Sequence, residues 1–174
     1  MTIERTGIIQ LAGKDATIVG ADVSIGDVAQ DFRVHSLDWA LVQGIGDTVG
    51  KIRIIAAVPS LETEVCDREA RRFNQAASDL GEELVIEVIS TDLPYTQKRW
   101  CGASGVDRVM VLSDHLLTEF GEKYGCLIKE RRILRRAVFI VDRHEMIAYA
   151  ACMPALGDEP DYGEVLEVAQ SLTT

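Results

Sequence analysis

Cys66 is the residue whose position is best suited to chemistry, because it follows a proline-led turn at the start of an expected helix. If Thr63 caps this helix, Cys66 falls in its first turn, where backbone N–H groups have no partner within the helix. Those groups and the positive end of the helix dipole favour a thiolate, which is the reactive form of cysteine. The spacing therefore predicts a nucleophilic sulfur at Cys66.

Charged residues on the same helix act on such a thiolate in both directions. Glu64 and Asp67 disfavour it, whereas Arg68 and Arg71 favour it. A nucleophilic cysteine here therefore needs a dedicated cation from another part of the fold. The arginines that lead into an expected strand at 136–141 are the candidates.

The three other cysteines have different surroundings. Cys101 lies in a Trp-Cys-Gly stretch that can bend, which makes it the second candidate for a functional thiol. Cys126 and Cys152 lie at the ends of expected elements, and we expect them to be small core side chains, since cysteine is among the most buried residue types. The chain has no Cys-x-x-Cys pair or Cys/His cluster at zinc spacing, so no metal site is expected.

Apolar strands and amphipathic helices must position these residues. The chain begins with an expected hairpin at about 8–20 and short strands near 32–34 and 39–42. Further strands are expected over 52–58, 84–89 and 109–112. Helices are expected over 64–80, from 94 to Gly102 or Gly105, and over 116–124. A second hairpin over 136–151 and a helix over 161–172 follow. We expect Gly81 to end the helix that carries Cys66.

The order of these elements predicts an α/β fold. A strand–helix–strand sequence indicates a parallel βαβ crossover, and the late hairpin adds antiparallel strands to the same central mixed sheet. Together with helices flanking the sheet, the N-terminal β-hairpin and a reactive cysteine at the first helix, this pattern fits a thioredoxin-like fold. The length of 174 residues predicts a single domain over 1–174.

Composition excludes several classes of function. The net charge is −10, with 28 acidic against 18 basic residues, so nucleic acid is not an expected partner. The basic cluster at 129–136 is short, and for most of its residues it indicates a solvated face or pairing with an anion. No apolar run approaches the roughly 18–20 residues of a membrane span, and residues 1–6 lack the pattern of a signal peptide. We therefore expect a cytoplasmic protein with mostly reduced cysteines and no membrane contact.

Several motifs occur in a fixed order along nearly the whole chain. They are Pro59-x-x-x-Thr63-x-x-Cys66, Leu93-Pro94 ahead of Arg99-Trp100-Cys101-Gly102, Arg136-Ala137-Val138-Phe139, and Glu159-Pro160-Asp161-Tyr162. This series resembles the thiol peroxidase (Tpx) subfamily of peroxiredoxins, of the atypical two-cysteine type. The proline–threonine–cysteine motif is highly specific by itself.

The resemblance implies a role for each matching residue. The Cys66 thiolate would attack a peroxide and become a sulfenic acid, Thr63 would hydrogen-bond the thiolate and the peroxide, and Pro59 would shield the sulfur. Arg136 would favour the thiolate and stabilise charge on the breaking O–O bond. Neighbouring residues of a strand point to opposite faces, so either Arg136 or Arg135 should reach the site, and the motif favours Arg136.

The same resemblance implies a complete reaction cycle. Cys101 would resolve the sulfenic acid into an intrachain disulfide after local unwinding, because in this family the two sulfurs are too far apart in the reduced fold. A thioredoxin-like dithiol would then reduce the disulfide. The expected activity is reduction of hydrogen peroxide and organic hydroperoxides to water and alcohols, without a cofactor, by a homodimer.

An alternative is a redox sensor or relay that uses the same oxidation of Cys66 to pass a disulfide to a partner protein. Multiple turnover with a reductant distinguishes the enzyme, whereas stoichiometric oxidation and a stable mixed disulfide distinguish the sensor. A general dithiol reductase is disfavoured, because Cys66 and Cys101 do not form a Cys-x-x-Cys pair.

Overall fold

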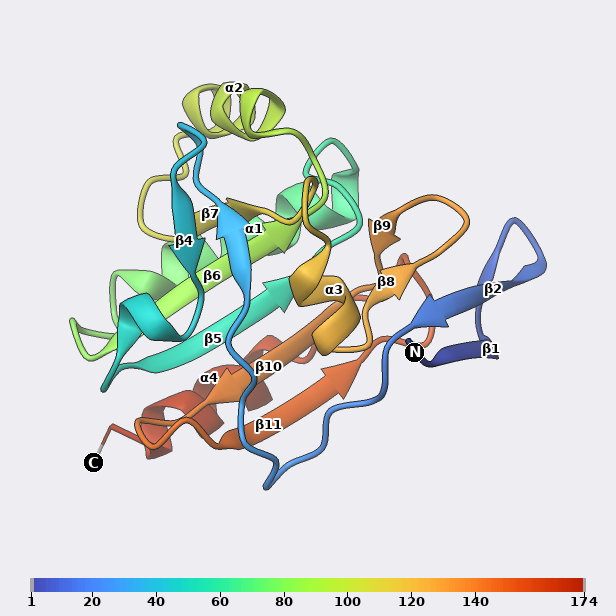
Figure 1. Cartoon of the computed structure of the whole chain (residues 1–174). Helices are drawn as coiled ribbons and strands as arrows, with labels where there is room; N and C mark the ends of the chain where they lie inside the picture. Colours follow the sequence, from blue (N-terminus) through green and yellow to red (C-terminus); the bar gives the residue numbers. More distant parts are fainter. Residues whose placement is uncertain (1, 174) are drawn as a thin grey trace.

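A seven-stranded mixed sheet forms the centre of the computed structural model, which describes residues 2–173 (Figure 1). In spatial order its strands are β11 (Ile147–Cys152), β10 (Ala137–Val141), β5 (Ile52–Ala57), β6 (Leu84–Ser90), β7 (Met110–Ser113), β3 (Arg33–His35) and β4 (Leu41–Gln43). β5, β6 and β7 run parallel, while β10 pairs antiparallel with both β5 and β11. The predicted mixed sheet with a parallel crossover is therefore confirmed.

The helices lie on both faces of this sheet. They are α1 (Glu64–Ala77), α2 (Pro94–Ser104), α3 (Glu119–Lys123) and α4 (Tyr162–Ser171), with a short 3-10 helix at Gly46–Thr48. Ile54 of β5 packs in one core with Phe73 of α1, whereas its neighbour Ile55 packs in the opposite core with Phe120 of α3. β5 is buried on both faces, as its mostly apolar run predicts.

A second sheet contains the predicted N-terminal hairpin. Its strands are β1 (Glu4–Leu11), β2 (Lys14–Val19), β8 (Leu127–Ile128) and β9 (Ile133–Leu134), in that spatial order. β1 begins earlier than the expected start near residue 8, and the turn is made by Ala12 and Gly13, both with positive φ. β8 and β9 were not expected, because two-residue strands carry no readable alternation.

Some helix boundaries differ from the expectation, most clearly those of α1 and α3. α1 ends at Ala77 with Ser78 as its C-cap, so the prediction that it continues to Gly81 was wrong. Gly81 instead supplies a positive φ of 72° in the turn that follows. α3 is also shorter than the expected 116–124 helix. α2 ends as expected, with Gly105 in the left-handed conformation as its C-cap.

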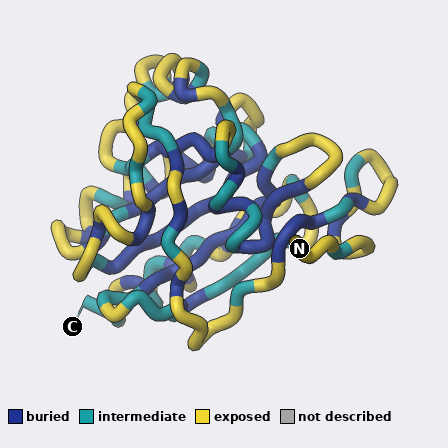
Figure 2. The backbone as a smooth tube through the Cα atoms, viewed as in Figure 1, coloured by how far each residue is buried: buried dark blue, intermediate teal, exposed yellow. Residues whose placement is uncertain are grey.

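Burial follows this layered arrangement. Figure 2 shows the central strands β5, β6 and β10 buried, while α2 is largely exposed at one end of the molecule. No helix within residues 2–173 has the length and apolar character needed to cross a membrane.

Candidate active site

Cys66 lies in the first turn of α1, at the carboxyl edge of β5. Thr63 is the N-cap residue, as the spacing predicted, and its backbone is extended with φ −93° and ψ 147°. The thiol is completely buried, with an exposed fraction of 0%. The local sequence therefore places the sulfur among the unpaired N–H groups of a helix N-terminus and screens it from bulk water.

Arg136 supplies the cation that Cys66 requires. It lies directly before β10, is only 1% exposed, and its Nη2 donates to the Cys66 sulfur at 3.2 Å. The guanidinium also donates to the Leu156 carbonyl, through Nε at 3.2 Å and Nη2 at 2.9 Å. Burial lowers the pKa of Arg136, but the adjacent Glu69 carboxylate and Cys66 outweigh burial and raise it overall. The sulfur therefore faces a fixed, permanently charged donor.

Glu69 completes a buried cluster with Arg136 and Cys66. Its carboxylate is 0% exposed and accepts a hydrogen bond from Arg136 Nη1. Burial raises the pKa of Glu69 to about 7, although Arg136 opposes that rise. The sequence analysis did not select this residue. The available signal was its position three residues after Cys66, which places both side chains on one side of α1.

The acidic residues that were expected to oppose the thiolate have cationic partners. Glu64 pairs with Arg68 at 3.5 Å, and Asp67 pairs with Arg71 at 2.9 Å. Asp67 also accepts a hydrogen bond from Trp100 Nε1 at 2.8 Å, which links α1 to α2. Their charges are thus partly compensated, so Arg136 acts on Cys66 against a weaker opposing field.

Thr63 and Pro59 lie in the loop that enters α1. Pro59 is buried immediately beyond β5, whereas Thr63 is exposed. The Thr63 hydroxyl donates to the Ser60 carbonyl at 2.9 Å rather than to Cys66. The hydrogen bond to the sulfur implied by the family resemblance is therefore not formed in this structure, and the Cys66 sulfur accepts from Arg136 instead.

Asp92 fixes the same loop and was not selected from the sequence. Its carboxylate accepts from Ser60 Oγ at 2.7 Å, from the Leu61 backbone N–H at 2.9 Å and from Ser90 Oγ at 2.7 Å. These bonds tie the loop before α1 to the end of β6. The only signal in the sequence was the position of Asp92 between an expected strand and Leu93-Pro94.

Cys101 lies in α2 and is half-buried against the same core as Cys66. Burial raises the pKa of its thiol, so at neutral pH the protonated form predominates. Both cysteines are free and both helices are intact. The structure therefore describes the reduced state with the two thiols separate.

Comparison with known proteins assigns the chain to a family. The model of the AhpC/TSA family matches residues 25–150, which is more than half of the sequence. The chain belongs to the AhpC/TSA family.

Individual relatives place this peroxiredoxin within the thiol peroxidase group. A thiol peroxidase of Oceanobacillus iheyensis is 47% identical over 150 residues, covering 86% of this chain and 90% of that protein. A thiol peroxidase of Bacillus subtilis is 42% identical over 166 residues, covering 94% of this chain and 97% of that protein. A peroxiredoxin-like protein from Aquifex aeolicus has a solved structure with a TM-score of 0.86, 34% identity and 98% coverage of both chains. The predicted subfamily and thioredoxin-like fold are confirmed.

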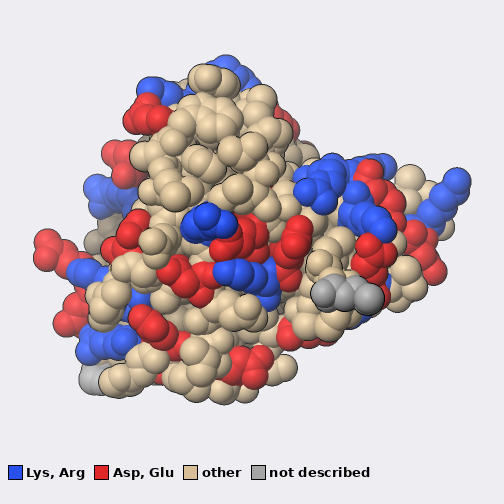
Figure 3. All heavy atoms as spheres, viewed as in Figure 1, with Lys and Arg blue, Asp and Glu red and all other residues tan. Residues whose placement is uncertain are grey.

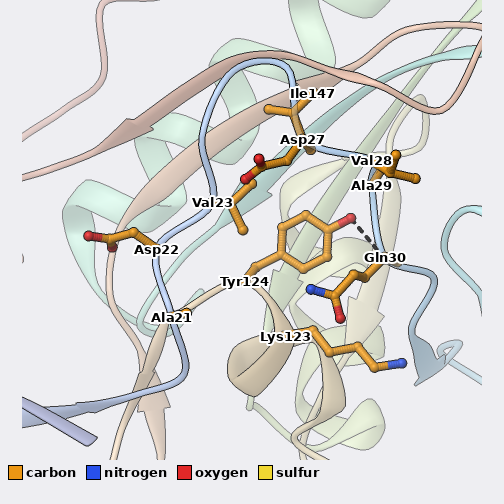
Figure 4. Close-up of a pocket in the computed structure, with 10 residues that line it drawn as sticks. All are labelled: Ala21, Asp22, Val23, Asp27, Val28, Ala29, Gln30, Lys123, Tyr124 and Ile147. Atoms are coloured by element: carbon orange, nitrogen blue, oxygen red, sulfur yellow. Dashed lines mark hydrogen bonds between the residues drawn. The ribbon is translucent and has the colours of Figure 1, made fainter. Parts of the chain in front are cut away.

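One cavity of this peroxiredoxin lies away from Cys66. It has a volume of about 200 Å³ and lies beneath the segment 21–30, with Lys123 and Tyr124 on its other side (Figure 4). The Tyr124 hydroxyl donates to the Gln30 carbonyl at 2.9 Å and so holds the segment against the core. None of the five predicted site residues lines this cavity, so it does not belong to the active site.

Proposed function

We propose that the protein is a thiol peroxidase in which Cys66 is the peroxidatic cysteine. The single observation that carries the assignment is the hydrogen bond from buried Arg136 to the Cys66 sulfur, at 3.2 Å. A buried thiol without a cation is inert, whereas a thiolate beside a fixed guanidinium is an activated nucleophile. The thiol peroxidase relatives support a peroxide as the substrate, and the proposal includes both hydrogen peroxide and organic hydroperoxides.

In the first step the Cys66 thiolate attacks one oxygen of the hydroperoxide. An S–O bond forms, the O–O bond breaks, and the second oxygen leaves as water or an alcohol after taking up a proton. The sulfur is oxidised by two electrons to a sulfenic acid. Arg136 stabilises the thiolate before attack and the negative charge that develops on the departing oxygen. Buried Pro59 limits the access of water to the sulfur.

In the second step the Cys101 thiol attacks the sulfenic sulfur. A Cys66–Cys101 disulfide forms, and the sulfenic oxygen leaves as water. The step requires local opening of the helices that hold the two thiols, and the exposure of α2 supports opening there. A dithiol protein of the thioredoxin type then reduces the disulfide by thiol exchange.

The test follows NADPH consumption with thioredoxin, thioredoxin reductase and cumene hydroperoxide. We expect Cys66→Ser to abolish turnover. Cys101→Ser should lose thioredoxin-dependent turnover but still consume about one equivalent of hydroperoxide, since Cys66 remains. Full activity in Cys66→Ser would contradict the assignment. Stoichiometric oxidation of the wild-type protein, with no multiple turnover, would favour a redox sensor or relay instead.

The proposal includes a homodimer in the cytoplasm. Figure 3 shows a broad uncharged surface at the end of the molecule where α2 and β4 lie. Exposed apolar side chains include Leu41, Leu93 and Tyr95. The ring of Trp39 packs against that of Tyr95, with 5.5 Å between the ring centroids. Such a surface supports contact between two copies, and four free thiols suit a reducing compartment. Light scattering that gives a monomer mass at every concentration would contradict the dimer.

A further inference from the structure

The connection between β11 and α4, residues 153–161, supplies a backbone carbonyl that holds Arg136. The Leu156 carbonyl accepts from Arg136 Nε at 3.2 Å and from Nη2 at 2.9 Å. The same Nη2 donates to the Cys66 sulfur at 3.2 Å. The direction of Nη2 therefore depends on where the Leu156 carbonyl lies. This matters because a donor acts on a reacting atom only when it is held close to the productive geometry.

Little regular structure fixes this β11–α4 connection. None of residues 153–161 belongs to a helix or strand, and most of residues 154–159 are exposed. A backbone hydrogen bond from the Asp158 N–H to the Ala155 carbonyl, at 3.2 Å, closes a turn within it. The Leu156 side chain packs against the apolar cluster beneath the N-terminal hairpin, which anchors the connection on that side. The side toward α1 needs an anchor of its own.

Glu159 joins the connection to α1, the helix that carries the reactive thiol. Its Oε1 accepts from Arg68 Nε at 2.9 Å and from the Tyr162 hydroxyl at 3.0 Å. The hydrogen bond from Arg68 is the main reason that the pKa of Glu159 lies below its usual value. Arg72 lies over the Tyr162 ring, 5.7 Å from its centroid, and Phe73 meets that ring edge-on with 5.5 Å between centroids. One carboxylate and one aromatic ring thus hold the end of the connection on α1.

We propose that Glu159 is a positioning residue for the reaction with peroxide. Its hydrogen bonds hold the β11–α4 connection against α1, and the connection in turn holds the Leu156 carbonyl in place. This carbonyl directs the Arg136 guanidinium toward the Cys66 sulfur. The role of Glu159 rests on the proposed function, in which Cys66 is the peroxidatic cysteine.

The charge of Glu159 acts in the direction opposite to this positioning role. Burial is the main reason that the pKa of Glu69 is raised, and the Glu159 carboxylate adds to the rise. Its negative charge therefore reaches the pair that Glu69 forms with Arg136, and a negative charge near a thiolate disfavours that thiolate. Acting through charge alone, removal of Glu159 would accelerate the reaction. If Glu159 positions Arg136, its removal slows the reaction, so the sign of the effect separates the two.

Stopped-flow measurement of the reaction of the reduced protein with excess hydrogen peroxide gives this sign. Glu159→Gln should lower the second-order rate constant by about three- to fivefold, the upper range of what an exposed ion pair contributes. The matched control is Asp158→Asn, which removes the same charge from the neighbouring residue. No hydrogen bond or ion pair of the Asp158 side chain is present among residues 2–173, so this variant should not slow the reaction.

A pH titration of the ultraviolet absorbance of the thiolate reports on Arg136 separately. The same titration of each protein with Cys66→Ser is subtracted, which leaves the signal of Cys66. In Glu159→Gln the midpoint should move to higher pH, since Arg136 no longer stabilises the thiolate as fully. A purely structural role of Glu159 would lower the free energy of unfolding and leave this midpoint in place.

The outcomes distinguish this role from the proposed function. An unchanged or faster reaction in folded Glu159→Gln, an unmoved midpoint, or equal slowing in Asp158→Asn would each overturn the positioning role of Glu159. A wild-type protein that still reacts through Cys66 would leave the peroxidatic assignment intact in all three cases. A wild-type protein without any reaction that depends on Cys66 would contradict both.

Discussion

The hydrogen bond between Trp100 and Asp67 should limit formation of the Cys66–Cys101 disulfide. Trp100 of α2 directly precedes Cys101, and Asp67 of α1 directly follows Cys66. The bond from Trp100 Nε1 to the Asp67 carboxylate is 2.8 Å long and so joins the two helices. Trp100 is 6% exposed and is one of only three buried residues of α2, with Pro94 and Gln97. Opening of either helix must break this contact. Trp100→Phe removes the N–H donor but keeps an aromatic ring in the core.

The size of the effect follows from the surroundings of the bond. A hydrogen bond to a charged group contributes about 1.5–3 kcal/mol. Asp67 is 34% exposed and keeps its ion pair with Arg71, so water and Arg71 replace part of the lost interaction, which leaves about 1 kcal/mol. This value corresponds to an open state populated about fivefold more, since 1.4 kcal/mol is a factor of ten. Disulfide formation should accelerate by about the same factor.

Rapid quenching followed by mass spectrometry separates the two steps. The reduced protein is mixed with one equivalent of cumene hydroperoxide, and sulfenic acid and disulfide are quantified over time. Trp100→Phe should leave the first step unchanged and accelerate the second. Trp39→Phe is the matched control, because the Trp39 indole N–H has no hydrogen-bond partner. At high peroxide, Trp100→Phe should also accumulate less sulfinic acid, since the sulfenic acid is consumed sooner.

An unchanged or slower second step in Trp100→Phe would refute this reasoning, provided that the variant is folded. It would mean that opening does not require the Trp100–Asp67 bond to break. Equal acceleration in Trp39→Phe would instead indicate a general loosening of the protein.

Further predictions concern the loop and the buried carboxyls. Asp92→Ala removes the acceptor for Ser60, Leu61 and Ser90. It should lower the free energy of unfolding, measured by urea titration, by about 2–4 kcal/mol, and it should slow the reaction of Cys66 with hydroperoxide. Wild-type values for both quantities would contradict the role of Asp92. Burial raises the pKa of Glu87 to about 8, so the folded state retains a proton that the unfolded state releases near pH 4.5. The free energy of unfolding should therefore fall as the pH rises from about 4.5 to about 8, and a matching decrease in Glu87→Gln would disprove this origin.

Local patterns predicted the elements that position the site. The apolar run of β5, the proline after it and the periodicity of α1 placed Cys66 in the first turn of a helix, and the structure agrees. Strand alternation also predicted that only one of Arg135 and Arg136 faces Cys66. These features depend on neighbours in sequence, which is why they could be read from it.

Contacts between distant residues were not predictable in the same way. The bonds from Ser60 to Asp92 and from Arg136 to Glu69 join residues 32 and 67 positions apart, and no local pattern encodes such partners. The Thr63 hydroxyl, expected near the sulfur, selects the nearer Ser60 carbonyl. The predicted end of α1 at Gly81 was also wrong, because the helix ends at Ala77 with Ser78 as its C-cap.

The most direct test of the account is the rate at which Cys66 reacts with a hydroperoxide in Arg136→Met. In stopped-flow measurements with excess peroxide, we expect the second-order rate constant to fall by about 100-fold or more, because the donor to the sulfur and to the departing oxygen is lost. The Glu69→Gln variant, which keeps Arg136, should be measured in the same way for comparison. A rate constant in folded Arg136→Met equal to that of the wild type would contradict the central claim that Arg136 activates Cys66.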